Sequence, residues 1–171
     1  MKLQLATQSD IPQIKEVYKG IVDKMFADGI EMWNDDYPES ALTLDVNEGE
    51  LYLLKEGGEL LGAFALNPIA LGEKHVKWQK DNAKVTYLKR MAVNATVQSK
   101  GIARLLIQYA KDEARSKGYE YLRLFVVDYN EPAINLYRSE NFIQAEGVYE
   151  DNLSDELRFI ELGLEIKLLT D

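Results

Sequence analysis

Cysteine is absent from the 171 residues, and histidine occurs once, at position 75. Without cysteine the chain forms no disulfide, carries no thiol nucleophile and offers no thiolate ligand, which suits a reducing compartment. His75 has no second histidine with which to share a metal ion, and we interpret it as a surface residue. We therefore expect a cytoplasmic protein without a bound metal.

Long apolar segments and an excess of basic residues are also lacking. The first ten residues contain no apolar stretch of signal-peptide length. No apolar run approaches the roughly 18 residues that a membrane helix needs. Acidic residues outnumber basic ones by 29 to 20, which gives a net charge of −9. A chain with this charge repels a phosphate backbone, so we expect neither nucleic acid nor membrane as a partner.

Strand-like and helix-like apolar spacings alternate along the chain, of which 46% is hydrophobic. A chain of this length buries one core, so we expect a single domain spanning 1–171. The spacing predicts strands at 3–5, 51–54, 60–66, 85–93, 121–127, 143–149 and 157–169, and helices at 11–25, 39–47, 99–117 and 132–140. The pair Gly57-Gly58 between two of these strands is typical of a hairpin. The order predicts a mixed α/β fold.

The segment 98–104 lies between an expected strand and an expected helix. A helix N-terminus presents unpaired N–H groups and a positive dipole end, which together bind a pyrophosphate. Gly101 lacks a Cβ and lets an anion approach the backbone, and Ala103 allows close packing. The alternative is a plain turn before a helix. The predicted phosphate site consists of Gln98, Ser99, Lys100, Gly101, Ile102, Ala103 and Arg104.

Two motifs in the expected order resemble those of the GNAT acetyltransferase family. Arg90–Val93 followed by Gln98–Ala103 is similar to the family's motif A. Asn130–Tyr137, followed by Asn141 and Phe142, is similar to motif B, in which an asparagine precedes a tyrosine by seven residues. Asn141 stands where glycine is usual, and asparagine is the next best residue for a left-handed backbone. The resemblance covers essentially the whole chain.

This resemblance implies a fold, an activity and a cofactor site. The fold is a mixed central sheet of about seven strands flanked by about four helices. The activity is transfer of an acetyl group from acetyl-CoA, as co-substrate, to a primary amine. The cofactor would contact Met91, Ala92, Val93, the phosphate site at 98–104, Asn130, Ala133 and Tyr137. Tyr137 would face the sulfur as the general acid, although helical spacing also allows it to pack between Ile134 and Phe142.

The general base does not carry over from the resemblance. Family members that acetylate histones often place a glutamate six residues before the position of Val93, and Tyr87 stands there. Glu31, Asp35 and Asp36 are candidates from the loop after the first helix. The alternative for each of them is an exposed, solvated acidic loop.

Aromatic loop residues predict an acceptor pocket. Trp33, Tyr37 and Trp78 lie in irregular segments, and Tyr87 stands where family members that acetylate histones often carry a glutamate. Aromatic side chains in loops often line ligand sites, but they also pack as small satellite clusters of the core. We therefore predict acceptor contacts at these residues and keep packing as the alternative.

Two other functions compete with catalysis. One is a CoA-binding regulatory module of the same fold that has lost catalysis, which the missing carboxylate at Tyr87 favours and the presence of Tyr137 disfavours. The other is a nucleotide-phosphate binder that uses the same helix terminus, but no Walker lysine followed by Ser or Thr is present. The residues leave the acceptor, the use of other acyl groups and a homodimer open.

Overall fold

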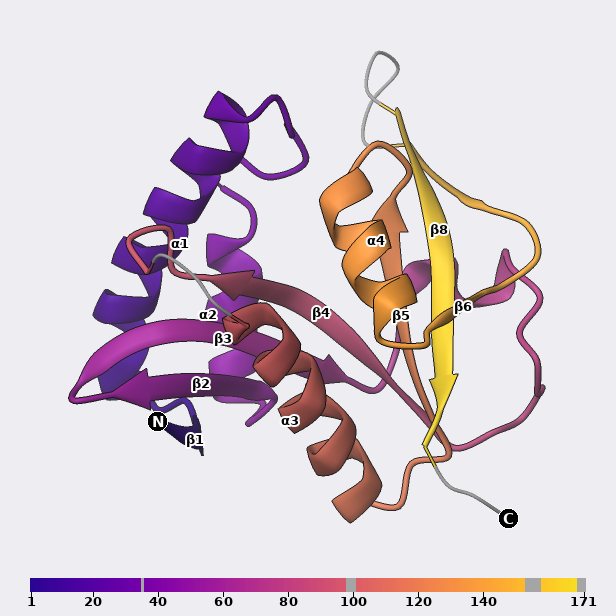
Figure 1. Ribbon diagram of the computed structural model, residues 1–171, viewed down its shortest axis with the longest axis horizontal. Coiled ribbons are helices and arrows are strands. Elements are labelled where there is room, and N and C mark those ends of the chain that lie inside the picture. Colours follow the sequence, from indigo (N-terminus) through magenta and orange to yellow (C-terminus); the bar gives the residue numbers. More distant parts are fainter. Residues whose placement is uncertain (35, 98–100, 153–157, 169–171) are drawn as a thin grey trace. The chain divides into compact units, whose positions relative to one another are not determined.

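The computed structural model describes residues 1–34, 36–97, 101–152 and 158–168. The chain forms two compact units, the first made of Met1–Asn67 with Lys89–Ala110 and the second of Pro68–Leu88 with Lys111–Asp171. Strand β4 (Val85–Val93) runs through both units (Figure 1). The expected single domain over 1–171 stays a prediction.

Four strands form the sheet of the first unit, in the order β1-β2-β3-β4. β1 (Lys2–Leu5) pairs antiparallel with β2 (Leu51–Glu56), which pairs antiparallel with β3 (Glu59–Asn67). Gly57 and Gly58 both have positive φ, 57° and 88°, which side chains with a Cβ rarely adopt. The predicted hairpin at this glycine pair is therefore confirmed.

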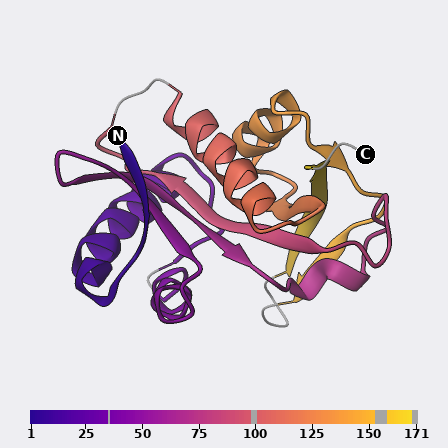
Figure 2. The ribbon, with the colours of Figure 1, turned by 90° about the horizontal axis from the view of Figure 1, so that it is seen from below.

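Helices cover both faces of this sheet. α1 (Ile11–Ala27) and α2 (Glu39–Asn47) lie below the strands in Figure 2, and the first part of α3 (Ile102–Ser116) lies above them. Side chains alternate between the faces of β3, so Ala63 and Ala65 meet α1 and α2 while Gly62 meets α3. A Cβ on Gly62 would lie 2.8 Å from Leu106 and from the carbonyl of Ala92, so glycine allows α3 to pack closely.

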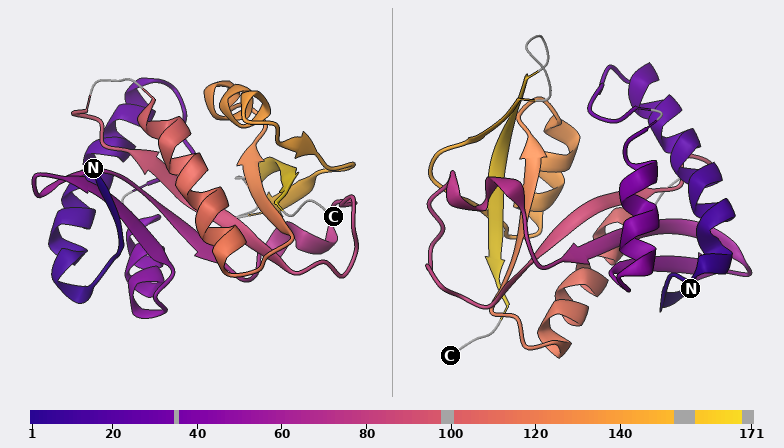
Figure 3. Two further views of the ribbon diagram at one scale, coloured as in Figure 1. Left: turned by 60° about the horizontal axis from the view of Figure 1, so that its bottom comes forward. Right: turned by 180° about the vertical axis from the view of Figure 1, so that it is seen from behind.

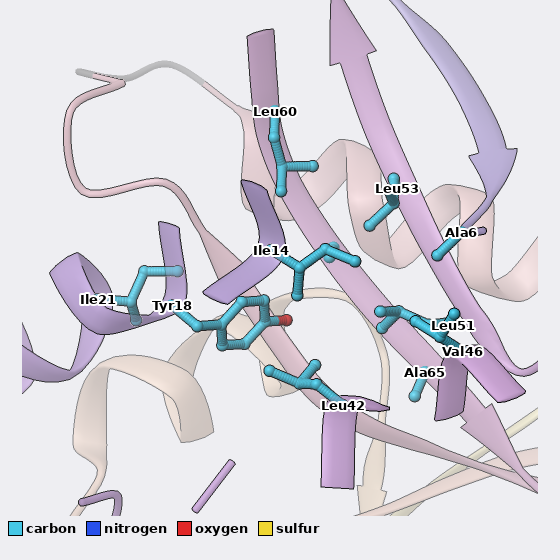
Figure 4. Packing of buried hydrophobic residues seen from close by; sticks show 11 residues of the cluster. Ala6, Ile14, Tyr18, Ile21, Leu42, Val46, Leu51, Leu53, Leu60 and Ala65 are labelled. Carbon is cyan, nitrogen blue, oxygen red and sulfur yellow. The ribbon is translucent and has the colours of Figure 1, made fainter. Parts of the chain in front are cut away.

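One hydrophobic cluster of the first unit lies between α1, α2 and the strands (Figure 4). Apolar residues of α1 recur at helical spacing and form one apolar face. The strand β2 is buried on both faces, and its side chains Leu51 and Leu53 belong to this cluster. The buried residues of this cluster are Ala6, Ile14, Tyr18, Ile21, Leu42, Val46, Leu51, Leu53, Leu60, Ala63 and Ala65.

The second unit contains the start of β4 and the C-terminal strands, in the order β4-β5-β8-β6. β5 (Tyr121–Val127) pairs parallel with Val85–Tyr87 and antiparallel with β8 (Arg158–Lys167), which lies beside it in both views of Figure 3. β6 (Ile143–Gln144) and β7 (Tyr149–Asn152) each pair with β8. α4 (Glu131–Ser139) follows β5, and a 3₁₀ turn, η2, spans Leu71–Lys74.

The eight strands and four α-helices of the described residues confirm the predicted mixed α/β fold. The predicted strand at 143–149 is wrong, because the chain forms two short strands with a turn between them. Gly147 turns the chain with a φ of 91°, and the Glu146 carbonyl accepts a hydrogen bond from the Lys77 N–H at 2.9 Å. The segment around Gly147 thus leaves β8 to pair with a distant loop.

Candidate functional site

The N-terminus of α3 is the place where the sequence predicts phosphate binding. Gly101 has a φ of 89°, and a Cβ added there would meet no atom of the described residues within 4 Å other than those of its chain neighbours. Ile102 is buried and fixes the first turn, whereas Arg104 is exposed. Because the first N–H groups of a helix have no partner within it, this open end can receive an anion. Gln98, Ser99 and Lys100 lie outside the described residues.

The end of β4 holds the residues Met91–Val93, which the family resemblance places against the cofactor. The parallel pairing with β5 covers Val85–Tyr87, and the half-buried Met91–Val93 follow later in the strand, within the first unit. Gly101–Arg104 belong to the same unit. An extended backbone such as Met91–Val93 can bind the amides of a ligand as a further strand would.

Arg90 precedes this segment with a left-handed backbone, φ 50°, and a buried side chain. Its Nε and Nη2 donate to both carboxylate oxygens of Asp45, at 2.6 and 2.7 Å. Nη2 also donates to the side-chain oxygen of Asn67 at 2.6 Å, and Nη1 donates to the Tyr37 hydroxyl at 3.3 Å. The Tyr18 hydroxyl donates to the Arg90 carbonyl at 2.6 Å. Sequence reasoning missed this network, because its members are far apart in the chain.

Trp33 and Tyr37 flank this network in the first unit. Trp33 is half-buried, with its ring 5.9 Å from that of Tyr18, and Tyr37 is 41% exposed. The Asn34 side chain accepts hydrogen bonds from the N–H groups of Asp36 and Tyr37, at 2.9 and 2.8 Å, and so orders the turn. The turn leaves Tyr37 accessible to a ligand.

The acidic residues proposed as bases lie in and before this turn. Glu31 and Asp36 are exposed, and Asp35 lies outside the described residues. Their exposure favours the solvated-loop alternative, and a role as base stays a prediction.

Trp78 and Tyr87 belong to a buried cluster of the second unit. Trp78 is 7% exposed, donates from Nε1 to the Glu73 carbonyl at 2.9 Å, and lies 4.4 Å below the Arg123 guanidinium. Arg123 in turn pairs with the buried Glu165 at 3.1 Å. Tyr87 is fully buried, and burial raises the pKa of its phenol. This burial favours packing at both positions, and their acceptor contacts stay predictions.

Within the described residues, the Tyr87 hydroxyl is buried without a hydrogen-bond partner. His75, which precedes this cluster in the chain, is exposed as predicted, with its ring 4.9 Å from Tyr149. The residues that the structure describes hold no group of three or more acidic or histidine side chains able to bind a metal ion.

α4 positions the remaining predicted cofactor residues, all in the second unit. The Asn130 side chain accepts a hydrogen bond from the Ala133 N–H at 3.4 Å and so caps this helix. Tyr137 lies two turns further along and is 8% exposed, with its ring 5.5 Å from Phe142. Burial raises the pKa of the Tyr137 phenol, so it is protonated at neutral pH. Asn141 has a φ of 67°, as its place in the motif predicts.

Comparison with known proteins gives one family. A model described as the Acetyltransferase (GNAT) family matches residues 15–142. The [ribosomal protein bS18]-alanine N-acetyltransferase of Escherichia coli K12 is 32% identical over 112 residues, which are 64% of this chain and 67% of that protein. An uncharacterized N-acetyltransferase of Dictyostelium discoideum is 27% identical over 82 residues, 48% of this chain and 38% of that protein.

Solved structures share the fold at low sequence identity. A GNAT-family acetyltransferase of Streptococcus agalactiae has a TM-score of 0.80 at 18% identity, with 99% of this chain and 96% of that chain covered. The structure of yncA from Salmonella typhimurium, determined with acetyl-CoA as its cofactor, has a TM-score of 0.66 at 20% identity and covers 99% and 95% of the two chains. None of the helices described here is long and apolar enough to cross a membrane.

Proposed function

The chain belongs to the Acetyltransferase (GNAT) family, and we propose that it transfers the acetyl group of acetyl-CoA to a primary amine. The observation that carries the proposal is the open, glycine-led N-terminus of α3 in the same unit as the Met91–Val93 strand. The amine acceptor is supported by the E. coli relative, whose name gives the alanine of a ribosomal protein as its substrate.

The cofactor contacts follow from two features of the first unit. The pyrophosphate would lie beside Gly101, where, apart from the two chain neighbours, no atom of the described residues lies within 4 Å of the position a Cβ would take. The N–H groups at the start of α3 would donate to the phosphate oxygens, with Arg104 adding positive charge at the exposed edge. The backbone of Met91–Val93 would pair with the pantetheine amides.

The chemistry requires a neutral amine and a protonated leaving group. An amine with a pKa near 10.4 is neutral in about one molecule in 1000 at pH 7.4, a cost of roughly 4 kcal/mol. A water or a carboxylate of the 31–36 loop would take the proton that the amine loses as it attacks the thioester carbonyl. As the carbon–sulfur bond breaks, the Tyr137 phenol would donate its proton to the sulfur.

A CoA-binding module without catalysis is the second candidate. It is favoured by Tyr87, which stands where related enzymes often carry a carboxylate and is fully buried here. Both candidates predict the same cofactor binding, so only turnover separates them.

Calorimetry and a thiol-release assay test the proposal in sequence. Acetyl-CoA should bind at one site per chain and more tightly than ATP, and equal or tighter binding of ATP would refute the phosphate site. Free CoA should then accumulate only when an amine acceptor is added. Binding of acetyl-CoA without turnover on a broad panel of amines would favour the non-catalytic module.

A further inference from the structure

Arg90 is held in an unfavourable backbone conformation directly before the strand segment that the proposed function assigns to pantetheine. A φ of 50° is rare for any residue other than glycine and is not compatible with a regular strand. The chain direction of Met91–Val93 therefore depends on whether Arg90 stays left-handed. Contacts with other residues must hold this conformation, because the intrinsic backbone preference of arginine favours a negative φ.

The Arg90 side chain is held by two elements that do not belong to β4. The two bonds to the Asp45 carboxylate join it to α2, and both side chains are more than nine-tenths buried. The bond to the Asn67 oxygen joins it to the end of β3. A bidentate guanidinium–carboxylate pair fixes direction as well as distance, because its two N–H groups are coplanar.

Asn67 is itself oriented by acidic partners. Its amide nitrogen donates to Asp45 at 3.0 Å and to Glu50, which turns its oxygen toward the guanidinium. The amide thus has one arrangement that satisfies both its donor and its acceptor side. The result is a three-membered network rather than a single ion pair, in which Asp45, Asn67 and Arg90 each bond to the other two.

The Arg90 backbone is held from a third element. Tyr18 of α1 is 3% exposed and packs among Ile14 and Leu42 (Figure 4). That hydroxyl donates to the Arg90 carbonyl at 2.6 Å. The carbonyl direction follows from ψ of Arg90, so this bond fixes the backbone on the side of Met91.

We propose that Asp45 and Tyr18 are positioning residues, which hold Arg90 left-handed and so set the Met91–Val93 backbone in its cofactor-binding direction. This inference rests on the proposed function. We place neither residue in contact with the cofactor, and each acts by holding Arg90. Their loss lowers the fraction of molecules that are competent to bind, which weakens the apparent affinity by the same factor.

Two variants separately weaken the contact to the Arg90 side chain and the contact to the Arg90 carbonyl. Asp45→Asn replaces the bidentate charged pair by an amide, and Tyr18→Phe deletes only the hydroxyl and keeps the ring. We expect the dissociation constant for acetyl-CoA to rise about tenfold in Asp45→Asn and about threefold to fivefold in Tyr18→Phe. The effect is larger at Asp45 because hydrogen bonds between charged groups contribute more than a hydrogen bond to a neutral carbonyl. In both, amide hydrogen exchange at Met91–Val93 should become faster in the protein without cofactor.

Asp10→Asn is the matched control. Asp10 pairs with Lys55 at 2.7 Å in the same unit, is also buried, and makes no contact with the Arg90 network among the described residues. We expect this variant to lose thermal stability without any change in acetyl-CoA affinity or in exchange at Met91–Val93.

Calorimetry and hydrogen exchange, both well below the melting temperature, separate the outcomes. If the unmodified protein fails to bind acetyl-CoA, the proposed function is wrong. If it binds and folded Tyr18→Phe and Asp45→Asn bind equally well, the positioning role is refuted. Should Asp45→Asn fail to fold, Tyr18→Phe decides alone. An equal loss of affinity in Asp10→Asn would also refute it, because general destabilisation would then account for the effect.

Discussion

Replacing Tyr137 by phenylalanine isolates the proposed general acid. The substitution removes one hydroxyl and keeps the ring that lies 5.5 Å from Phe142, so the packing of α4 should persist. General acids contribute about 10²- to 10⁴-fold to rate. A thiolate with a pKa near 8.5 leaves readily, so we expect the low end, about 10²-fold in kcat or roughly 2.7 kcal/mol.

The pH dependence provides a second readout on Tyr137. Burial raises the pKa of its phenol, so its proton is lost only above the range in which an ordinary tyrosine ionises. Deprotonation of Tyr137 should therefore not lower the rate of the unmodified protein between pH 7 and about pH 10, where an ordinary tyrosine is half ionised. Below pH 7 the phenol is also protonated, so an acidic limb must come from another group.

Steady-state release of CoA and calorimetry with acetyl-CoA measure the effect of Tyr137→Phe. Affinity and melting temperature should stay unchanged while kcat falls. Tyr121→Phe is the control, because Tyr121 is a buried tyrosine of the same unit to which no chemical role is assigned. An unchanged kcat in Tyr137→Phe, with chemistry rate-limiting, would leave Tyr137 as a packing residue and refute the reasoning.

Three further substitutions test the cofactor site, the acceptor pocket and the packing of the second unit. Gly101→Val should abolish acetyl-CoA binding measured by calorimetry, because the branched side chain fills the space open to the pyrophosphate; Gly118→Val introduces similar strain at a φ of 74° and should leave binding intact. Trp33→Ala should raise the KM for the acceptor and leave CoA affinity unchanged, whereas equal damage to both would favour packing. Gly163→Ala should lower the free energy of unfolding by about 1–3 kcal/mol in a denaturant titration, because its Cβ would lie 2.9 Å from the Trp78 ring and 3.1 Å from Val76. Unchanged stability would show that these two side chains shift at no cost and would contradict the prediction.

Local signals predicted much of the fold. The glycine pair at Gly57-Gly58 sets a hairpin, and Asn130 caps α4, because each acts on backbone groups within a few residues of itself. The buried strand at 121–127 was also predictable, since a strand covered on both faces is apolar at nearly every position.

Pairings between distant segments were not predictable. The break in the expected strand at 143–149 depends on Lys77, which is nearly 70 residues earlier and pairs with Glu146. The ion pair between Asp45 and Arg90 joins positions 45 residues apart, and neither residue carries a local signal for the other. A left-handed arginine in a strand contradicts its intrinsic preference, so only the folded chain reveals it.

Transfer of a labelled acetyl group to an acceptor tests the central proposal most directly. The protein would be incubated with acetyl-CoA labelled with ¹³C in the acetyl group and a panel of small amines, polyamines and peptides, including peptides with an N-terminal alanine, and the products analysed by mass spectrometry. We predict that at least one amine gains the labelled acetyl group, and that Gly101→Val abolishes the transfer. Binding of acetyl-CoA with no labelled product in the whole panel would contradict catalysis.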